Sequence, residues 1–472
     1  MIIRQLIRSR RLYAQTCISL KLTALLVLTL LGSNLSAKAK PFKNGDVICF
    51  LGDSITHGGR YPFYVLDYYA TRFPEQKIII HNCGISGDTA KGGIERLQWD
   101  VIARKPTVTT IMFGMNDVGR SFYETKEPDK NNFKKRKGAI DVYKSKMKEI
   151  AAKLKENNIS IIYITPSPYD QTVNNKTRNL FGVNDALGEC AKFCREQATK
   201  NNAGLIEFNQ TMTAINEKGQ KTDPKFSLIG GDRVHPHSTG HMVMAYLFLK
   251  SQQMPAQVAS ISVNYKEAKL LLQKNCTVKN IRNENGKLSF DCLERSLPLP
   301  VTPEYLKADK LVPLTRDLND ETITVTGLPQ GEYTLFIDNQ KAVSADAAAW
   351  DKGINLALLD TPMQKQSAAI HSLVKQKLGA ESAIRNLRMM EIKMRRDKID
   401  IANPAEREKY LDDFLVKNKN SKYVNYYTRL VKSYRDKKPI ENELLETIRK
   451  MDAAIYQQNK PKEHHFLLKP NS

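Results

Sequence analysis

The chain has 472 residues, of which 41% are hydrophobic and 26% are charged. At roughly 100–200 residues per domain, this length predicts about two or three domains, or one large domain with an extension. The hydrophobic content excludes a wholly disordered chain. Basic residues exceed acidic ones by 23, and the excess is spread as 7, 8 and 8 over residues 1–40, 41–250 and 251–472. Because acidic residues interleave with the basic ones after residue 40, we expect no nucleic-acid partner.

The N-terminal segment has the arrangement of a secretory signal peptide. Four arginines precede an apolar stretch at residues 22–31, and small residues follow, ending at Ala37 and Ala39. About ten apolar residues fall short of the ~20 that a membrane-spanning helix needs. We therefore expect residues 1–39 to be removed by cleavage after Ala39 or, alternatively, after Ala37. The mature protein would be periplasmic or extracellular, with no stable membrane span.

From residue 46 to about residue 250, short apolar runs alternate with amphipathic stretches. The predicted strands cover residues 47–51, 77–81, 108–113, 159–164 and 204–208, and the predicted helices cover residues 61–72, 90–103, 139–157, 183–200 and 239–252. Strands that alternate with helices predict a parallel sheet covered on both faces. We expect a three-layer α/β/α domain of the flavodoxin-like kind over residues 40–254.

After residue 254 the pattern changes twice. Residues 255–350 are expected to form a small β-rich domain or insertion, and residues 351–472 a helical extension. No linker rich in Pro, Gly and Ser separates these parts from the α/β/α domain, whereas a mobile module would be expected to follow one. We therefore expect the helices to dock on the first domain near its cleft. An independent binding module is the alternative.

Two strand pairs are predicted within the β-rich part. Residues 276–282 and 287–292 flank the turn signal Asn285-Gly286, and residues 321–326 and 332–337 are expected to pair through the segment 327–331.

Six cysteines remain after the predicted cleavage, an even number that permits disulfides in an exported chain. The first hairpin would bring Cys276 and Cys292 close enough to bridge, although their redox state stays open. Cys190 and Cys194 lie four residues apart on a predicted helix and are expected to be small buried hydrophobic side chains. No Cys/His group has the spacing of a zinc site.

The loops that follow the predicted strands carry a set of polar side chains. In open α/β sheets ligands bind at the carboxyl ends of the strands, where this chain has Gly52-Asp53-Ser54, Ser86-Gly87-Asp88-Thr89, Gly114-Met115-Asn116-Asp117 and Asp232-Arg233-Val234-His235-Pro236. Taken singly, each has a simpler reading as a helix cap, a turn or a surface ion pair. Together they supply a nucleophile, a base, an acid that orients the base, and donors for an oxyanion.

In order and spacing, these four loops resemble the four sequence blocks of the GDSL-type or SGNH hydrolase superfamily. The resemblance covers about residues 45–250, with Ile55 in place of the family's Leu. It implies a catalytic set of Ser54, Asp232 and His235. It also implies an oxyanion hole built from Ser54, Gly87 and Asn116, with no metal or organic cofactor.

The same resemblance implies the chemistry. Ser54 would attack a carboxylic ester, His235 would accept its proton, and water would hydrolyse the resulting acyl-enzyme. By family analogy the substrate would be an acylated carbohydrate or small molecule, with acetyl as the expected acyl group. Lipase, thioesterase and arylesterase activities are the alternatives within this chemistry. A catalytically idle binding or scaffold protein is the alternative from another class, and the oligomeric state stays open.

Residues near the four blocks are given supporting roles. Asp53 is expected to brace the nucleophile loop, and Asp88 and Asp117 to act as caps or hydrogen-bond acceptors. Four residues that follow the nucleophile could wall the substrate cleft, namely His57, Arg60, Tyr61 and Tyr64. His237 and His241 are expected to be exposed or packed side chains.

Overall fold

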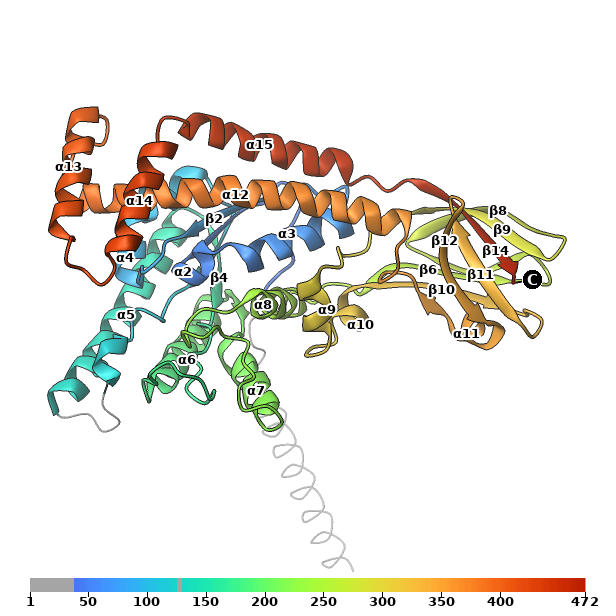
Figure 1. Cartoon of the computed structure of the whole chain (residues 1–472), viewed down its shortest axis with the longest axis horizontal. Coiled ribbons are helices and arrows are strands. Elements are labelled where there is room, and N and C mark those ends of the chain that lie inside the picture. The colour runs from blue at the N-terminus through green and yellow to red at the C-terminus, as the bar shows by residue number, and fades with distance from the viewer. Residues whose placement is uncertain (1–37, 125–129, 472) are drawn as a thin grey trace, which may run out of the picture.

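The computed structural model describes residues 38–124 and 130–471 (Figure 1). Most of the predicted signal peptide, residues 1–37, lies outside the described residues, so its cleavage stays a prediction. Within the described ranges, no helix combines the length and the apolar character needed to cross a membrane.

The first region is built on a five-stranded parallel sheet in the order β2-β1-β3-β4-β5. Its strands are β1 (Val47–Gly52), β2 (Ile79–Gly84), β3 (Val108–Met112), β4 (Ser160–Ile164) and β5 (Gly204–Ile206). The side chains from Ile48 to Leu51 in β1 are fully buried, as a sheet covered on both faces requires. The strand order reverses between β1 and β3, and this reversal opens a crevice at the carboxyl ends of these strands. The predicted flavodoxin-like fold is confirmed.

Helices cover both faces of this sheet. They are α2 (Ser54–His57), α3 (Arg60–Arg72), α4 (Ala90–Arg96), α5 (Lys130–Glu156), α6 (Val183–Asn201), α7 (Asn209–Gln220) and α8 (Ser238–Ser251). Helices α3 and α8 pack together, while α4, α5 and α6 pack in series. α5 begins at Lys130, before the predicted start at residue 139. The prediction missed the first turns of this helix because they are rich in lysine and show no apolar period. α2 and α7 were not predicted.

Two further sheets form the β-rich unit. One has the order β13-β10-β6-β7 and the other β12-β11-β14-β9-β8. The strands of the first are β6 (Gln257–Asn264), β7 (Lys269–Lys274), β10 (Asp320–Thr326) and β13 (Ile354–Asn355). The strands of the second are β8 (Cys276–Glu284), β9 (Lys287–Glu294), β11 (Glu332–Ile337), β12 (Gln340–Asp346) and β14 (Glu463–Pro470). Short helices α9 (Pro303–Asp309), α10 (Leu314–Leu318) and α11 (Ala347–Lys352) connect them.

The predicted pairing of residues 321–326 with residues 332–337 is wrong. β10 pairs in parallel with β6, whereas β11 pairs with β12 and β14 in the other sheet. The hairpin signal lies one turn later, at Asp338 and Asn339, which both have positive φ between the paired residues Ile337 and Gln340. A two-residue turn with positive φ at both positions matches the twist of a hairpin and favours Asn and Asp.

The prediction of a helical extension over residues 351–472 is wrong at its end, where the chain forms the strand β14. β14 lies in the middle of its sheet, between β11 and β9. Its side chains alternate, and His464, Phe466 and Leu468 are buried. This period of two is the pattern of a strand with one covered face.

The hairpin of β8 and β9 is confirmed, and it places the two cysteines diagonally across the strand pair. Cys276 is opposite Glu294, and Cys292 is opposite Val278. Both thiols are buried and free in this structure. Cys190 and Cys194 are buried on α6, as predicted.

The C-terminal helices lie along the hydrolase-like region (Figure 1). They are α12 (Pro362–Arg396), α13 (Pro404–Lys417), α14 (Val424–Lys437) and α15 (Glu441–Gln458). α12 contacts α3 and β2 on one side and α15 on the other. Ile85, which follows β2, is buried in a cluster with apolar residues of α12 and α14. The helices thus share hydrophobic cores with the first region, while the domain boundaries at residues 254 and 350 stay predictions.

Candidate active site

Ser54 lies at the carboxyl end of β1, where it begins α2. Asp53 caps this helix, with Oδ1 accepting a hydrogen bond from Ile55 N at 3.0 Å. A side chain at Gly52 would collide with Thr56 Oγ1 and with the carbonyl oxygen of Met112, so only glycine fits this turn. Burial raises the pKa of Asp53 to about 6. Asp53 therefore braces the loop, as expected from the sequence.

The structure brings Ser54, His235 and Asp232 into one hydrogen-bonded line. Ser54 Oγ lies 2.8 Å from His235 Nε2, and His235 Nδ1 lies 2.5 Å from Asp232 Oδ2. The other carboxylate oxygen, Asp232 Oδ1, accepts from the backbone N–H groups of Val234 and His235, each at 3.0 Å. Partial burial opposes ionisation, but these hydrogen bonds hold the pKa of Asp232 well below its usual range. An ionised Asp232 keeps a proton on Nδ1 and leaves the lone pair of Nε2 facing Ser54.

Arg233, between Asp232 and His235, anchors their loop, although no local pattern indicated this role. Its backbone is left-handed, with a φ of 65°. Its buried guanidinium donates from Nη1 to the carbonyl oxygens of Asp170 and Val173 and from Nε to that of Thr177, each at 2.9 Å. A non-glycine residue with positive φ persists where its surroundings hold it. Arg233 therefore determines the path of the loop that presents Asp232 and His235.

The two remaining loops follow β2 and β3, the strands on either side of β1. Gly87 has a φ of 78°, and a Cβ there would meet no atom within 4 Å, so the backbone conformation rather than space favours glycine. Asn116 is half-buried and donates from Nδ2 to the carbonyl oxygen of Asp88 at 2.8 Å. Asp117 Oδ1 accepts from Ala90 N at 2.8 Å, which matches its expected role as a cap. The loops of Gly87 and Asn116 are thereby joined to each other.

Beneath these loops lies a buried network centred on Arg96. Its Nε pairs with Asp88 Oδ2 at 2.8 Å and its Nη1 with Asp100 Oδ2 at 2.7 Å. The same guanidinium donates to the carbonyl oxygen of Cys83 at 2.8 Å and to that of Gly52 at 3.2 Å. Arg96 thus ties the end of β1 to the end of β2 and to the loop of Gly87. No local motif marked Arg96 or Asp100 in the sequence.

The C-terminal extension completes this network through Arg385 of α12. Arg385 Nη2 lies 2.7 Å from Asp100 Oδ1, and Nη1 donates to the carbonyl oxygen of Asn82 at 3.0 Å. Both charged side chains are fully buried. Asp100 therefore bridges Arg96 and Arg385, and a helix far along the chain supports the loops at the ends of β1 and β2.

The four residues proposed to wall the cleft divide into two groups. His57 is buried beneath the Gly87 loop, where Nδ1 accepts from Ser86 N at 3.1 Å. Burial, with the charges of Arg385 and Arg96, lowers the pKa of His57 to about 4, so its ring is neutral near pH 7. Tyr61 is buried in the core, so for these two the prediction is wrong. Arg60 and Tyr64 do line a cavity of about 300 Å³.

The two histidines near the start of α8 are structural, as expected. His237 is the N-cap of α8 and accepts from Gly240 N at 3.3 Å. His241 is buried and stacks on Tyr61, with 6.1 Å between the ring centroids.

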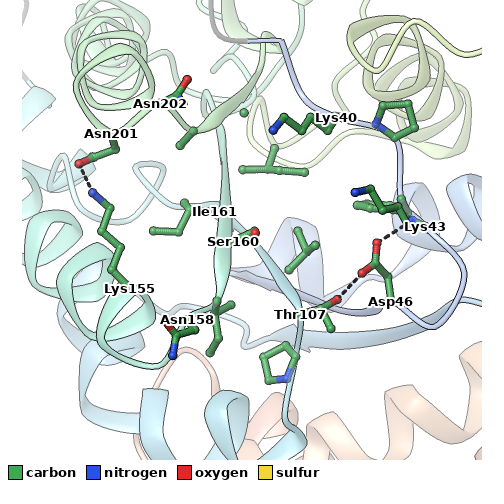
Figure 2. Close-up of a pocket in the computed structure, with 18 of the residues that line it drawn as sticks. Lys40, Lys43, Asp46, Thr107, Lys155, Asn158, Ser160, Ile161, Asn201 and Asn202 are labelled. Carbon is green, nitrogen blue, oxygen red and sulfur yellow. Dashed lines mark hydrogen bonds between the residues drawn. The ribbon is translucent and has the colours of Figure 1, made fainter.

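A second cavity, of about 720 Å³, lies at the opposite edge of the sheet (Figure 2). Val108 and Ser160, the first residues of β3 and β4, line it. Its polar groups bind one another: Lys155 Nζ donates to Asn201 Oδ1, and Thr107 Oγ1 donates to Asp46 Oδ1, each at 2.7 Å. This cavity is therefore separate from the Ser54 site, and four of its polar side chains pair with one another.

Comparisons with known proteins agree with this geometry. Residues 48–248 match the family of GDSL-like lipases and acylhydrolases. An acetylxylan esterase of Geobacillus stearothermophilus is 30% identical over 222 residues, which cover 44% of this chain and 94% of the esterase. The solved structure of BT4096, a gut microbial diltiazem-metabolizing enzyme, has a TM-score of 0.85 and 31% identity, and the match covers 92% of this chain and 100% of BT4096. That similarity therefore extends beyond residue 254. The chain belongs to the GDSL-like lipase/acylhydrolase family and is an esterase of that family.

Proposed function

We propose that this protein is an exported serine esterase that removes acetyl groups from carbohydrate, with Ser54 as nucleophile, His235 as general base and Asp232 as the acid that orients His235. The observation that carries this proposal is the pair of hydrogen bonds from Ser54 Oγ to His235 Nε2 and from His235 Nδ1 to Asp232 Oδ2, at 2.8 and 2.5 Å. A serine hydroxyl is a poor nucleophile until an adjacent base removes its proton.

The reaction proceeds in two halves. Ser54 Oγ bonds to the ester carbonyl carbon as its proton moves to His235 Nε2, and the carbonyl electron pair moves onto oxygen. The tetrahedral intermediate then collapses: the bond to the alcohol oxygen breaks, and His235 gives that oxygen its proton. Water attacks the acyl-enzyme in the same way, with His235 as base, and releases acetate and free Ser54.

The negative charge of the intermediate is stabilised by three donors: the backbone N–H groups of Ser54 and Gly87 and the side-chain amide of Asn116. The hydrogen bond from Asn116 to Asp88 O supports this role, because it fixes the orientation of the amide before substrate binds. Donors that are already oriented stabilise the developing charge without reorganisation.

The choice of substrate rests on the known relatives. The acetylxylan esterase supports acetylated carbohydrate. The similarity to BT4096, which includes the extension, favours a second candidate: an acetate ester with a bulky aromatic alcohol part, such as diltiazem. Lipase, thioesterase and arylesterase activities are the other members of the same chemistry. The hydrogen-bonded Ser54–His235–Asp232 line speaks against an idle scaffold.

A panel of esters tests the proposal. Release of acetate is measured from acetylated xylo-oligosaccharides, acetylated monosaccharides and diltiazem, and p-nitrophenol release from p-nitrophenyl acetate and p-nitrophenyl butyrate. We expect acetate release from the sugars, and its loss in Ser54→Ala. Release from diltiazem alone would select the second candidate. Activity on none of these esters, with the wild-type protein folded, would overturn the proposal.

Export is tested separately by N-terminal sequencing of the protein recovered from its native host. We expect the mature chain to begin at Lys40, or at Lys38 for cleavage after Ala37. A chain that begins at Met1 would overturn the proposed export.

A further inference from the structure

The hydrolase region and the extension together build the cavity of about 300 Å³ that Arg60 and Tyr64 line. Arg60 and Ser238 line it from the hydrolase region, whereas Glu304 of α9 and His371 and Lys375 of α12 line it from the extension. A short α/β hydrolase without these helices would lack half of this wall.

Two residues that line the cavity follow Ser54 and His235 closely in the chain. Arg60 begins α3 directly after the short helix that begins at Ser54, and Ser238 begins α8 just after His235. None of its lining residues comes from the loops of Gly87 and Asn116. Since His235 delivers the proton to the departing alcohol oxygen, the alcohol part of the ester points toward this cavity.

Polar groups converge on the cavity without partners of their own. In the described part of the chain, Arg60 and Lys375 make no hydrogen bond or ion pair. His371 Nδ1 lies 2.8 Å from Asp67 Oδ2, which leaves Nε2 of the ring free for a ligand. The other carboxylate oxygen, Asp67 Oδ1, is buried and has no partner among the described residues. Arg60 and Lys375 are exposed to solvent, so the buried Asp67 Oδ1 is the group that calls for a polar ligand, because buried polar groups are nearly always hydrogen-bonded.

The rest of the wall is apolar. Phe63, Val374 and Leu378 line the cavity together with the ring of Tyr64. Leu378 also packs against Gly59, where a side chain would collide with it. A ligand of this cavity therefore needs an apolar face as well as several hydrogen-bonding groups.

We propose that this cavity is the subsite for the alcohol part of the substrate and that it holds one sugar ring, recognised by Lys375 and Glu304 of the extension. The proposal rests on the esterase function proposed above. A sugar ring has hydroxyl edges that both donate and accept hydrogen bonds, and its C–H faces pack on apolar side chains. Cations and carboxylates around one cavity match the edges, and Phe63, Tyr64 and Leu378 match a face.

The size of the cavity narrows the substrate further. Pockets for small ligands span about 300–1,000 Å³, and this one lies at the lower end. It accommodates a single ring rather than a stretch of polymer. The subsite thus predicts that acetylated monosaccharides are turned over at least as well, per kcat/KM, as acetylated polysaccharide.

The test compares two acetate esters that share the acyl group and differ in the alcohol. Lys375→Met and Glu304→Gln are assayed on an acetylated methyl xyloside and on p-nitrophenyl acetate, whose alcohol has no hydroxyl groups for the subsite to recognise. We expect each variant to lower kcat/KM on the xyloside by about tenfold or more, the loss of a hydrogen bond to a charged group. On p-nitrophenyl acetate the change should stay within about twofold. The matched control is Gln376→Met, an exposed neighbour on α12 that does not line the cavity, and it should leave both rates unchanged.

Ser54→Ala, measured in parallel, separates the two proposals. If Ser54→Ala keeps its activity, the proposed esterase mechanism fails. If Ser54→Ala is inactive while Lys375→Met and Glu304→Gln reduce both esters equally, or neither, only the subsite is overturned. A wild-type enzyme that hydrolyses p-nitrophenyl acetate but not the xyloside overturns the subsite as well.

Discussion

The hydrolase sheet and the extension differ in how far apart along the chain their contacting segments lie. In the hydrolase sheet each strand pairs with strands of the same α/β segment, and the reactive residues sit in the loops between them. In the extension, β14 at the chain end completes a sheet begun by β8 and β9, and α12 returns to lie against α3 and β2. The extension is therefore closed by its last strand and joined to the hydrolase region along the length of α12.

The two regions form one functional unit, because residues of the extension contact the hydrolase region close to its reactive loops. The hydrolase loops carry Ser54, His235 and Asp232, while Arg385 of the extension meets Asp100 at the ends of β1 and β2. Glu304 and Lys375 of the extension line one cavity together with Arg60 and Ser238 of the hydrolase region. An extension that only bound a partner elsewhere would have no reason to bury an arginine under the hydrolase sheet. The following predictions, from the largest expected effect to the smallest, separate the chemistry of the loops from the support that the extension gives.

Ser54→Ala tests the chemistry alone. We expect turnover of a short acyl ester to fall by several orders of magnitude, because the activated nucleophile is lost while the fold is unchanged. Circular dichroism should show the same folded fraction as the wild type. If the variant kept more than about a tenth of the activity, Ser54 would not be the nucleophile.

Removal of the extension tests whether the extension stabilises the hydrolase region. Because α12 and α14 bury Ile85 and α12 supplies Arg385, we expect a chain ending near residue 255 to unfold or to lose its activity. Limited proteolysis of the mature protein should find the segment near residue 255 resistant to cleavage. A stable fragment that kept full activity and its thermal midpoint would contradict the docked arrangement.

Asn116→Ala removes one proposed donor to the oxyanion. Loss of a single donor of this kind lowers kcat by about 10²–10³-fold. The readout is kcat on p-nitrophenyl acetate, and KM should change little, since the donor acts on charge that develops in the transition state. A rise in KM with kcat unchanged would mean that Asn116 binds the ground-state ester instead.

Arg385→Met tests the buried bridge between the two regions. Removing one partner of a buried ion pair leaves the other charge poorly compensated, which typically costs about 3–5 kcal/mol. Because Arg96 and Arg104 still face Asp100, we expect the lower end of that range, measured by urea unfolding. The control is Arg449→Met, an arginine exposed on α15, which should change the free energy of unfolding by less than about 1 kcal/mol.

Much of this architecture could be predicted because its signals are local. The strands of the hydrolase sheet are short buried apolar runs, and Ser54, Asn116, Asp232 and His235 lie in loops directly after strands or before a helix. The carboxyl ends of parallel strands meet at one edge, and the resemblance to the hydrolase family assigned Ser54, His235 and Asp232 to one catalytic set.

The contacts that could not be predicted depend on distant partners. Arg385 meets Asp100 across 285 residues, and an arginine in a basic, amphipathic helix gives no local sign of such a partner. The sequences of β10 and β11 are typical of a hairpin, yet β10 pairs with β6 and β11 pairs with β12. β14 is an eight-residue strand whose partners lie more than a hundred residues earlier, so its alternation alone did not identify it as central.

The smallest predicted effect concerns His241, which links the start of α8 to the core. Burial lowers the pKa of His241 to about 3, and its Nδ1 has no hydrogen-bond partner among the described residues. Below about pH 6.5 the unfolded chain binds a proton at this ring, while the folded chain stays neutral until about pH 3, so acidification removes stability across this window. His241→Phe keeps an aromatic ring beside Tyr61 and abolishes the proton uptake. Relative to the wild type, the free energy of unfolding of the variant should therefore rise by about 1.4 kcal/mol per pH unit between pH 6 and pH 4, with no trend above pH 7. Urea unfolding at pH 7.5, 5.5 and 4.5 measures this difference in the free energy of unfolding between variant and wild type. A difference that did not change with pH would show that His241 takes up its proton equally in the folded and the unfolded chain.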